Sequence, residues 1–298
     1  MSATDSNWTK LAQFVRALTG RQMAGRNLTV FDDDVFLVSY PRSGNTWTRF
    51  LIGNLLSPDP ITFRNIESHI PEIYFNPDRV LRRLPRPRIL KSHECFQPRY
   101  KRVIYILRDH RDVAVSNYHH NLKAGNIPDD YPWDEFVDRF LKAEFDKPFG
   151  SWADHVASWI YLREHDPGFL LLRYEEMKKD APGELRRIAR FLEQCSFRQV
   201  GLQPERLTRA IELSSPDRMR ELEKQQAHTW VVTRHTRADK PFIRTATAGG
   251  WKSTLSRAAV AKIEAAWGGL MVRLGYQLTT VSGDRRQLEE PATTAKPI

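Results

Sequence analysis

Cysteine is scarce in this sequence of 298 residues, where only Cys95 and Cys195 occur. Two cysteines so far apart form neither a disulfide framework nor the paired spacing of a zinc site, which indicates a reducing compartment and no metal. Long apolar runs are missing too, since no stretch reaches the roughly 18 apolar residues of a membrane span. The N-terminus opens without the apolar segment of a secretory signal. The sequence therefore predicts a cytoplasmic protein with no membrane span.

Acidic residues are outnumbered by basic ones, with 36 Asp and Glu against 46 Lys and Arg, for a formal net charge of +10. The sequence pI is about 9.7. Such a balance favours polyanionic partners, which include nucleic acid, an anionic surface and a nucleotide with several phosphates. Composition alone leaves all three open.

Short apolar runs alternate with helical patterns along the chain. The runs are continuous rather than alternating, which is typical of parallel strands that are buried on both faces. We therefore predict an α/β fold, a single domain with a central parallel sheet flanked by helices. The predicted strands are 35–40, 88–91, 102–107 and 168–174, and the predicted helices are 46–56, 133–141, 151–165 and 184–194.

The domain organisation follows from the ends of the chain. Residues 1–30 are predicted to form an N-terminal helical extension, because apolar residues recur at helical intervals within 8–23. Residues 31–278 form the predicted domain, since no internal repeat and no Pro-, Gly- or Ser-rich linker divides them. Residues 279–298 are polar and are expected to be a disordered tail.

A phosphate-binding turn is predicted at residues 40–47, Tyr-Pro-Arg-Ser-Gly-Asn-Thr-Trp, between the first strand and its helix. Free backbone N–H groups and the helix dipole make such a turn an anion site. Gly44 allows a close backbone approach, Ser43 and Thr46 offer hydroxyls, and Arg42 adds a fixed positive charge. The turn is P-loop-like, but it lacks the spacing of a Walker A motif.

This turn resembles the Y-P-K-S-G-T-T-W loop of the cytosolic-type sulfotransferase family, which binds 3′-phosphoadenosine 5′-phosphosulfate (PAPS). Four further segments that are similar to family motifs follow in family order, and together the resemblance spans roughly residues 30–275. The segments are Lys91-Ser92-His93, residues 106–120 with Arg108 and Ser116, residues 170–180 with Tyr174, and residues 242–252 with Arg244.

The resemblance implies a PAPS-dependent sulfotransferase that moves a sulfonate group to an acceptor hydroxyl by in-line displacement. His93 is implied as the general base, with Arg42 and Lys91 stabilising charge. The residues implied in PAPS binding are Arg42, Ser43, Gly44, Asn45, Thr46, Trp47, Arg108, Ser116, Tyr174, Ser214, Arg244, Thr245 and Ala246.

Several positions depart from the family pattern. Arg42 stands where the family has Lys, and because its pKa exceeds about 12 it can neutralise charge but is a poor proton donor. Asn45 replaces Thr, while Thr245 and Ala246 replace Lys and Gly. The family's usual dimer motif, which begins at the position of Lys252, is not evident.

The acceptor is not specified by these motifs, although a small molecule is favoured over carbohydrate or protein. Segments 61–85, 119–133 and 220–240 are the expected pocket walls, and the apolar candidates among them are Phe63, Ile70, Ile73, Tyr74 and Phe75.

Two other functions remain as alternatives. One is a nucleotide-dependent kinase with a degenerate phosphate loop, in which Asp109 and Asp112 would hold Mg²⁺. The other is a nucleic-acid-binding protein, which the net charge alone suggests.

Overall fold

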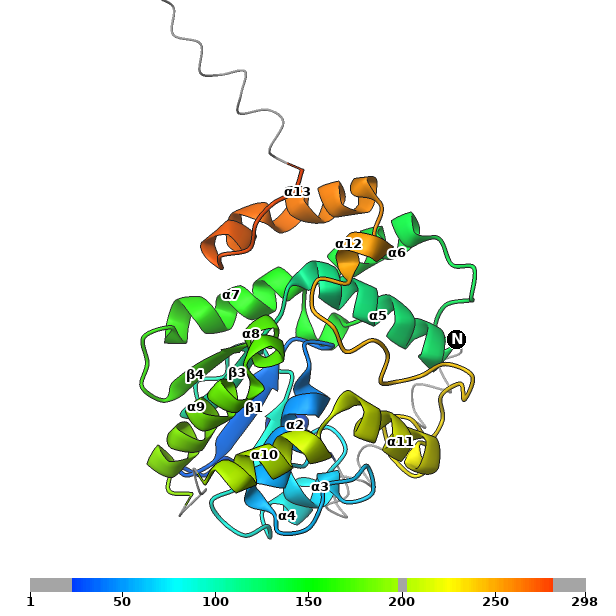
Figure 1. The fold of residues 1–298 in the computed structure, drawn as a ribbon. Coiled ribbons are helices and arrows are strands. Elements are labelled where there is room, and N and C mark those ends of the chain that lie inside the picture. The colour runs from blue at the N-terminus through cyan, green and yellow to red at the C-terminus, as the bar shows by residue number, and fades with distance from the viewer. Residues whose placement is uncertain (1–22, 198–202, 281–298) are drawn as a thin grey trace, which may run out of the picture.

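A parallel sheet of four strands forms the centre of the protein (Figure 1). The computed structural model describes residues 23–197 and 203–280. The strand order is β2-β1-β3-β4, so β1 and β3 lie inside and β2 and β4 lie at the edges. The strands are β1 (Val35–Ser39), β2 (Ile89–Ser92), β3 (Arg102–Leu107) and β4 (Phe169–Arg173). All four predicted strands are confirmed, each within one or two residues of its predicted ends.

Helices occupy most of the remaining chain. The predicted helices at 46–56, 133–141, 151–165 and 184–194 correspond to α2 (Asn45–Leu56), α6 (Trp133–Leu141), α7 (Trp152–Arg163) and α9 (Ala181–Gln194). The other longer helices are α5 (His110–Ala124), α10 (Pro204–Leu213), α11 (Pro216–Gln226) and α13 (Arg257–Arg273). The short helices are η1 (Gly25–Asn27), α3 (Ile66–His69), α4 (Asp78–Leu81), η2 (Lys147–Phe149), α8 (Tyr174–Lys179) and α12 (Trp251–Thr254).

The helices form two layers, one on each face of the sheet (Figure 1). Successive strand residues point to opposite faces, so Phe36 and Val38 pack in the core below α5, α6 and α7. Val35 and Leu37 pack in the core below α2, α9 and α10. Both faces are therefore buried, which explains the continuous apolar runs of the strands.

The carboxyl ends of the four strands meet at one edge of the sheet, as parallel pairing requires. The segments that follow these ends carry the predicted site residues: the 40–44 turn after β1, His93 after β2, Arg108 after β3 and Tyr174 after β4. The topology therefore brings together motifs that are far apart in sequence.

The predicted domain bounds stay predictions. Most of the N-terminal extension and nearly all of the predicted tail lie outside the described residues. Among residues 23–197 and 203–280, no helix is both long and apolar enough to cross a bilayer.

Candidate functional site

The turn after β1 is built around two residues with positive φ. Arg42 has φ of 67° and Gly44 has φ of 99°, so the backbone bends sharply before α2 begins at Asn45. A Cβ atom on Gly44 would lie 2.5 Å from Cδ2 of the Tyr174 ring, closer than any side-chain contact allows. Glycine is therefore required here both by the backbone conformation and by the neighbouring ring.

The first turn of α2 leaves its backbone N–H groups available for an anion. Gly44 precedes the helix and, having no side chain, forms no capping hydrogen bond. The Nδ2 atom of Asn45 donates to Ser39 Oγ at 3.2 Å, and Thr48 Oγ1 donates to the Gly44 carbonyl at 3.2 Å. These bonds fix the turn with the helix N-terminus open, as a phosphate site requires.

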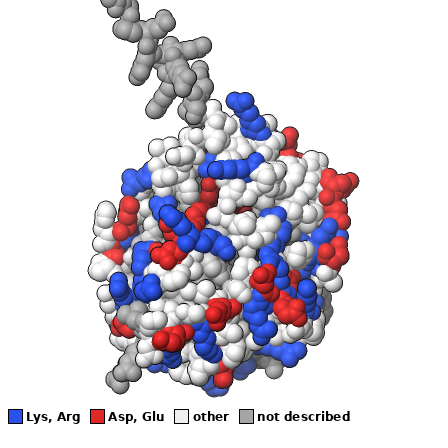
Figure 2. Space-filling model, in the orientation of Figure 1, with Lys and Arg blue, Asp and Glu red and all other residues white. Residues whose placement is uncertain are grey.

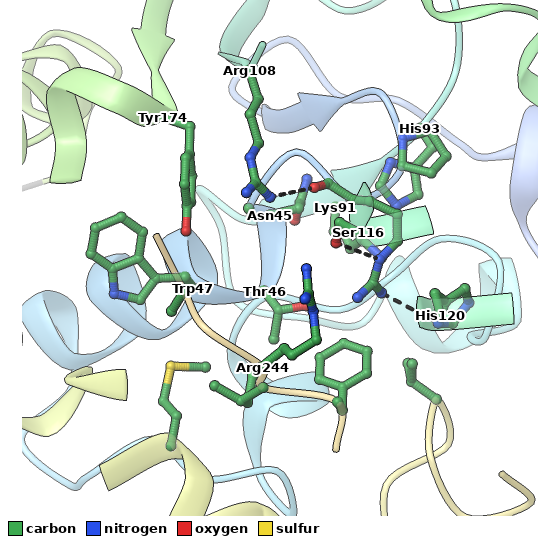
Figure 3. A pocket seen from close by; sticks show the side chains of 18 of the residues that line it. Asn45, Thr46, Trp47, Lys91, His93, Arg108, Ser116, His120, Tyr174 and Arg244 are labelled. Carbon is green, nitrogen blue, oxygen red and sulfur yellow. Dashed lines mark hydrogen bonds between the residues drawn. The ribbon is translucent and has the colours of Figure 1, made fainter. Parts of the chain in front are cut away.

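Arg42 of the turn, together with Lys91, Arg108 and Arg244 from other segments, lines one cavity. In Figure 3, Arg108 and Arg244 point toward each other across the middle of the cavity, and Lys91 lies beside His93. Burial, and then the neighbouring positive charge of Arg108, lower the pKa of the Arg42 guanidinium to about 10. Positive charges gathered this closely in one cavity favour a polyanionic ligand.

Arg108 is held in place by the turn itself. It donates through Nη1 to the Arg42 carbonyl at 3.1 Å and through Nη2 to the Thr247 carbonyl at 3.2 Å, while its guanidinium lies 4.2 Å from the centre of the Tyr174 ring. Its buried Nε has no hydrogen-bond partner among the described residues. Buried Ser43 Oγ is likewise without a partner in that part of the chain. Unsatisfied donors of this kind favour an anion as the missing partner.

Residues 242–249 form a strap across the cavity, seen in Figure 1 between α11 and α12. At one end, the backbone N–H groups of Phe242 and Ile243 donate to the Glu223 carboxylate at 2.5 and 2.8 Å. At the other end, the Gly249 N–H donates to Asp112 at 2.6 Å. The two carboxylates thereby hold Arg244 and the residues that follow it against the cavity.

Two aromatic rings lie at the end of the cavity away from His93 (Figure 3). The rings of Trp47 and Tyr174 meet edge to face, with centroids 5.8 Å apart. Trp47 is oriented by its Nε1, which donates to the Ser214 carbonyl at 3.0 Å, and the Lys178 ammonium lies 4.8 Å from its ring centre. Flat apolar rings beside clustered cations suit a nucleotide base and its phosphates.

His93 follows β2 and is buried at the other end of the cavity. Its backbone N–H donates to the Tyr74 hydroxyl at 3.0 Å, and its carbonyl accepts from His155 Nε2 at 3.0 Å. Its ring Nδ1 lies 2.6 Å from the Ser39 carbonyl. Burial, and then the positive charge of Lys91, lower the pKa of His93 well below 6.5. The ring is therefore neutral at neutral pH, as a general base must be.

The cavity joining these features has a volume of about 300 Å³. All of the predicted site residues line it except Ser43 and Ser214. Ser43 lies buried within the turn, and Ser214 is fully buried with its hydroxyl accepting a hydrogen bond from Asn54.

The expected acceptor walls contribute only in part. Of the apolar candidates in segment 61–85, only Phe75 lines the cavity. Phe63, Ile70 and Ile73 are core residues, and the Tyr74 hydroxyl accepts a hydrogen bond from the His93 backbone N–H. The three expected wall segments also contribute Glu72, His120 and Val232, and Phe242 and Ile243 come from the family-like segment 242–252. Asp146, Phe149 and Met219 lie outside these segments, and nothing local in the sequence marks them.

The carboxylates proposed for a kinase are already engaged. Asp109 caps α5 and pairs with Arg111 at 2.7 Å, and Asp112 anchors the strap. Within the described ranges, no group of three or more His, Cys, Asp or Glu side chains could hold a metal ion. Asp109 and Asp112 were the residues that suggested a Mg²⁺-dependent kinase, and these contacts give both of them other partners.

Comparison with known proteins gives the same answer as the residues. Residues 32–275 match the family model described as the sulfotransferase domain. Mouse sulfotransferase 1B1 is 30% identical over 251 residues, which cover 78% of this chain and 81% of the relative. Cytosolic sulfotransferase 12 of Arabidopsis thaliana is 28% identical over 270 residues, covering 83% of this chain and 80% of the relative.

Two solved structures extend this likeness to the fold. Mouse sulfotransferase SULT7A1, crystallised with PAP, is similar with a TM-score of 0.67 and 25% identity, covering 84% of this chain and 87% of that one. Retinol dehydratase in complex with androsterone and inactive cofactor PAP has a TM-score of 0.62 at 22% identity, with 83% of each chain covered.

Proposed function

This chain belongs to the sulfotransferase family and is a PAPS-dependent sulfotransferase, and we propose that it transfers the sulfonate to the hydroxyl of a small molecule with His93 as general base. The observation that carries the assignment of the base is the buried, neutral His93 ring, fixed through Nδ1 beside the cation cluster. Its Nε2 lone pair is the one left to receive a proton.

The residues present fit PAPS. The donor carries about four negative charges, which Arg42, Arg108, Arg244 and the open α2 N-terminus would balance. Trp47 and Tyr174 offer the rings for adenine, a contact worth roughly 1–3 kcal/mol per base. The chemistry supplied by PAPS is an activated sulfonate.

The residues then have separate tasks in an in-line transfer. His93 accepts the proton of the acceptor hydroxyl, while the Lys91 ammonium stabilises charge on the transferring group. Arg42 and the turn stabilise the phosphate oxygen from which the sulfonate departs. No residue forms a covalent bond to the substrate in this scheme.

The acceptor is proposed to be partly apolar. Phe75, Phe149 and Phe242 line the cavity, and the ring centroid of His93 lies 5.5 Å from that of Phe149. These rings favour an aromatic or aliphatic alcohol over a highly charged acceptor. A cytoplasmic location is proposed with it, because a relative is named as a cytosolic enzyme.

The nucleic-acid alternative gains no support from the surface. On the face in Figure 2, Lys and Arg side chains are interspersed with Asp and Glu rather than gathered in one stripe. This face therefore lacks the continuous basic track along a groove that such binding uses.

The test of the proposal is His93→Ala, compared with wild type by single-turnover transfer from labelled PAPS to a panel of phenols and alcohols. Turnover should be abolished, because the base acts on the acceptor. Binding of adenosine 3′,5′-bisphosphate (PAP), measured by calorimetry, should stay nearly unchanged. A variant that keeps most of the wild-type rate would remove His93 from the mechanism. Transfer by the wild type to none of the panel would exclude the proposed acceptor class.

A further inference from the structure

Lys91 forms a buried ion pair with a carboxylate from another segment. Its Nζ lies 2.5 Å from Glu72 Oε2, and the two side chains are only 8% and 5% exposed. Both residues line the cavity that contains His93. Neither the sulfotransferase motifs nor the proposed mechanism gives Glu72 a task.

Backbone pairing holds the two side chains together. Residues 71–73 run beside β2, with Glu72 and Lys91 as parallel partners. The Lys91 N–H donates to the Pro71 carbonyl at 2.8 Å, and the Ile73 N–H donates to the Lys91 carbonyl at 3.2 Å. Directly paired residues project their side chains to the same face, so the ion pair follows from this register.

A second ion pair, which is partly buried, holds the backbone of Glu72. The Glu72 N–H donates to Glu67 Oε2 at 2.9 Å, and Glu67 pairs through Oε1 with fully buried Arg49 at 2.7 Å. Asn76 donates to the Glu72 carbonyl at 2.9 Å. These contacts fix the backbone of Glu72, which keeps its side chain beside Lys91.

The charge of Lys91 depends on this neighbour. Burial lowers the pKa of Lys91, the Glu72 carboxylate opposes that shift, and the positive charge of Arg49 adds to it. Glu72 is the one carboxylate within ion-pair distance of Lys91 among the described residues. The titratable and charged groups that face Lys91 from the surrounding elements are Arg49 on α2, Glu67 on α3, Glu72, His93 and His120 on α5.

We propose that Glu72 is a positioning residue for sulfonate transfer, which keeps the Lys91 ammonium protonated and directed at the transferring group. The inference rests on the proposed role of Lys91. An ammonium has three donors, and the ion pair with Glu72 engages only one side of it, so donors remain for sulfonate oxygens. Without the carboxylate, burial favours the neutral amine, which stabilises no developing negative charge.

The first test is Glu72→Gln, with kcat measured from pH 6 to 10 at saturating PAPS. We expect kcat at neutral pH to fall at least about tenfold, as for the loss of a preorganised charge. Removal of the carboxylate lowers the pKa of Lys91 further, so the ammonium is lost at lower pH. The pH at which kcat falls on the alkaline side of the profile, its alkaline limb, should therefore be lower by about one pH unit or more. PAP affinity should change less than about twofold, because PAP lacks the sulfonate.

Two variants separate this effect from a structural one. Glu72→Asp keeps a carboxylate and should recover part of the rate and of the alkaline limb. Asn76→Ala removes a hydrogen bond to the same segment but leaves the carboxylate, so any loss of Tm should come without a shift of that limb. An alkaline limb unchanged in both Glu72 variants would overturn the proposal, and so would an equal shift in Asn76→Ala.

A double-mutant cycle with Lys91→Met decides whether Glu72 acts through Lys91. In the Lys91→Met background, Glu72→Gln should lower kcat by less than about twofold further. An equal loss in both backgrounds would overturn the proposal. If Lys91→Met alone keeps the wild-type kcat, the role of Lys91 itself fails. If Lys91→Met is impaired while Glu72→Gln is not, only the inference about Glu72 fails.

Discussion

The Nδ1 atom of His93 lies 2.6 Å from the Ser39 carbonyl oxygen, so one hydrogen bond joins the proposed base to the strand that precedes the phosphate turn. A carbonyl only accepts, which places the imidazole proton on Nδ1 and the lone pair on Nε2. The bond fixes the tautomer and the ring orientation together. It also sets the base relative to the turn, since Ser39 is the last residue of β1.

The pH dependence of turnover should follow the lowered pKa of His93. Because burial and Lys91 depress this pKa, the neutral form is fully present near pH 7 and is lost only as pH falls below the ordinary value of 6.5. A profile of kcat from pH 5 to 8 at saturating PAPS should be flat around neutrality, with its acid limb below 6.5. An acid limb at or above 6.5 would contradict the assignment.

Arg42→Ala should lower kcat by about two powers of ten or more, as the loss of a preorganised charge donor commonly does. PAP affinity should fall less, because the charge that Arg42 stabilises grows as the bond to sulfur breaks. Arg42→Lys should be milder, since an ammonium restores the charge. The measurements are single-turnover kinetics and calorimetry, with exposed Arg83→Ala as the matched control. Normal turnover with weaker PAP binding would make Arg42 a ground-state anchor only.

Chelators should leave activity unchanged. Arg and Lys side chains supply the positive charge of the cavity, and no cluster of metal ligands occurs among residues 23–197 and 203–280. Activity is measured after dialysis against EDTA and again after addition of Mg²⁺ or Zn²⁺. Loss in EDTA that either ion restores would point to metal-assisted chemistry.

The dimer contact typical of the family should be absent. Ser256, Arg257 and Ala261 stand at motif positions after Lys252, so the family's Val and Glu are both lost. Sedimentation analysis of Lys252→Glu should give the same oligomeric state as wild type. A crystal or solution dimer built on residues 252–261 would refute this expectation.

Sequence patterns predicted the strands and the phosphate turn because their signals are local. The apolar runs lie in consecutive residues, and the motif at 40–47 occupies one turn. The supports of the site were not predictable in this way. Glu223 accepts from residues about 20 positions away, and Asp112 accepts from Gly249, 137 positions away. In the sequence, Glu223 and Asp112 have the pattern of ordinary helix-surface residues, and only the fold places residues 242–249 within hydrogen-bond distance of them.

The cavity wall shows the same limit. Phe63 and Phe75 occur in one apolar segment, yet Phe63 is buried against Trp230 while Phe75 faces the cavity. Asp146 enters the wall from the loop before η2, where it accepts a hydrogen bond from Asn117 Nδ2 at 2.5 Å. Periodicity separates core from surface, but it does not separate core from the lining of a cavity.

The contact between Gly44 and the Tyr174 ring has an evolutionary consequence. Arg42 and Asn45 both differ from the family pattern, whereas Gly44 between them matches it. Side chains at 42 and 45 can be exchanged for others that carry a similar charge or hydrogen bond. At 44 even one methyl group would displace the ring of Tyr174. Substitution at 44 therefore requires a simultaneous change at 174. Positions 42 and 45 can change by single mutations, whereas Gly44 between them cannot.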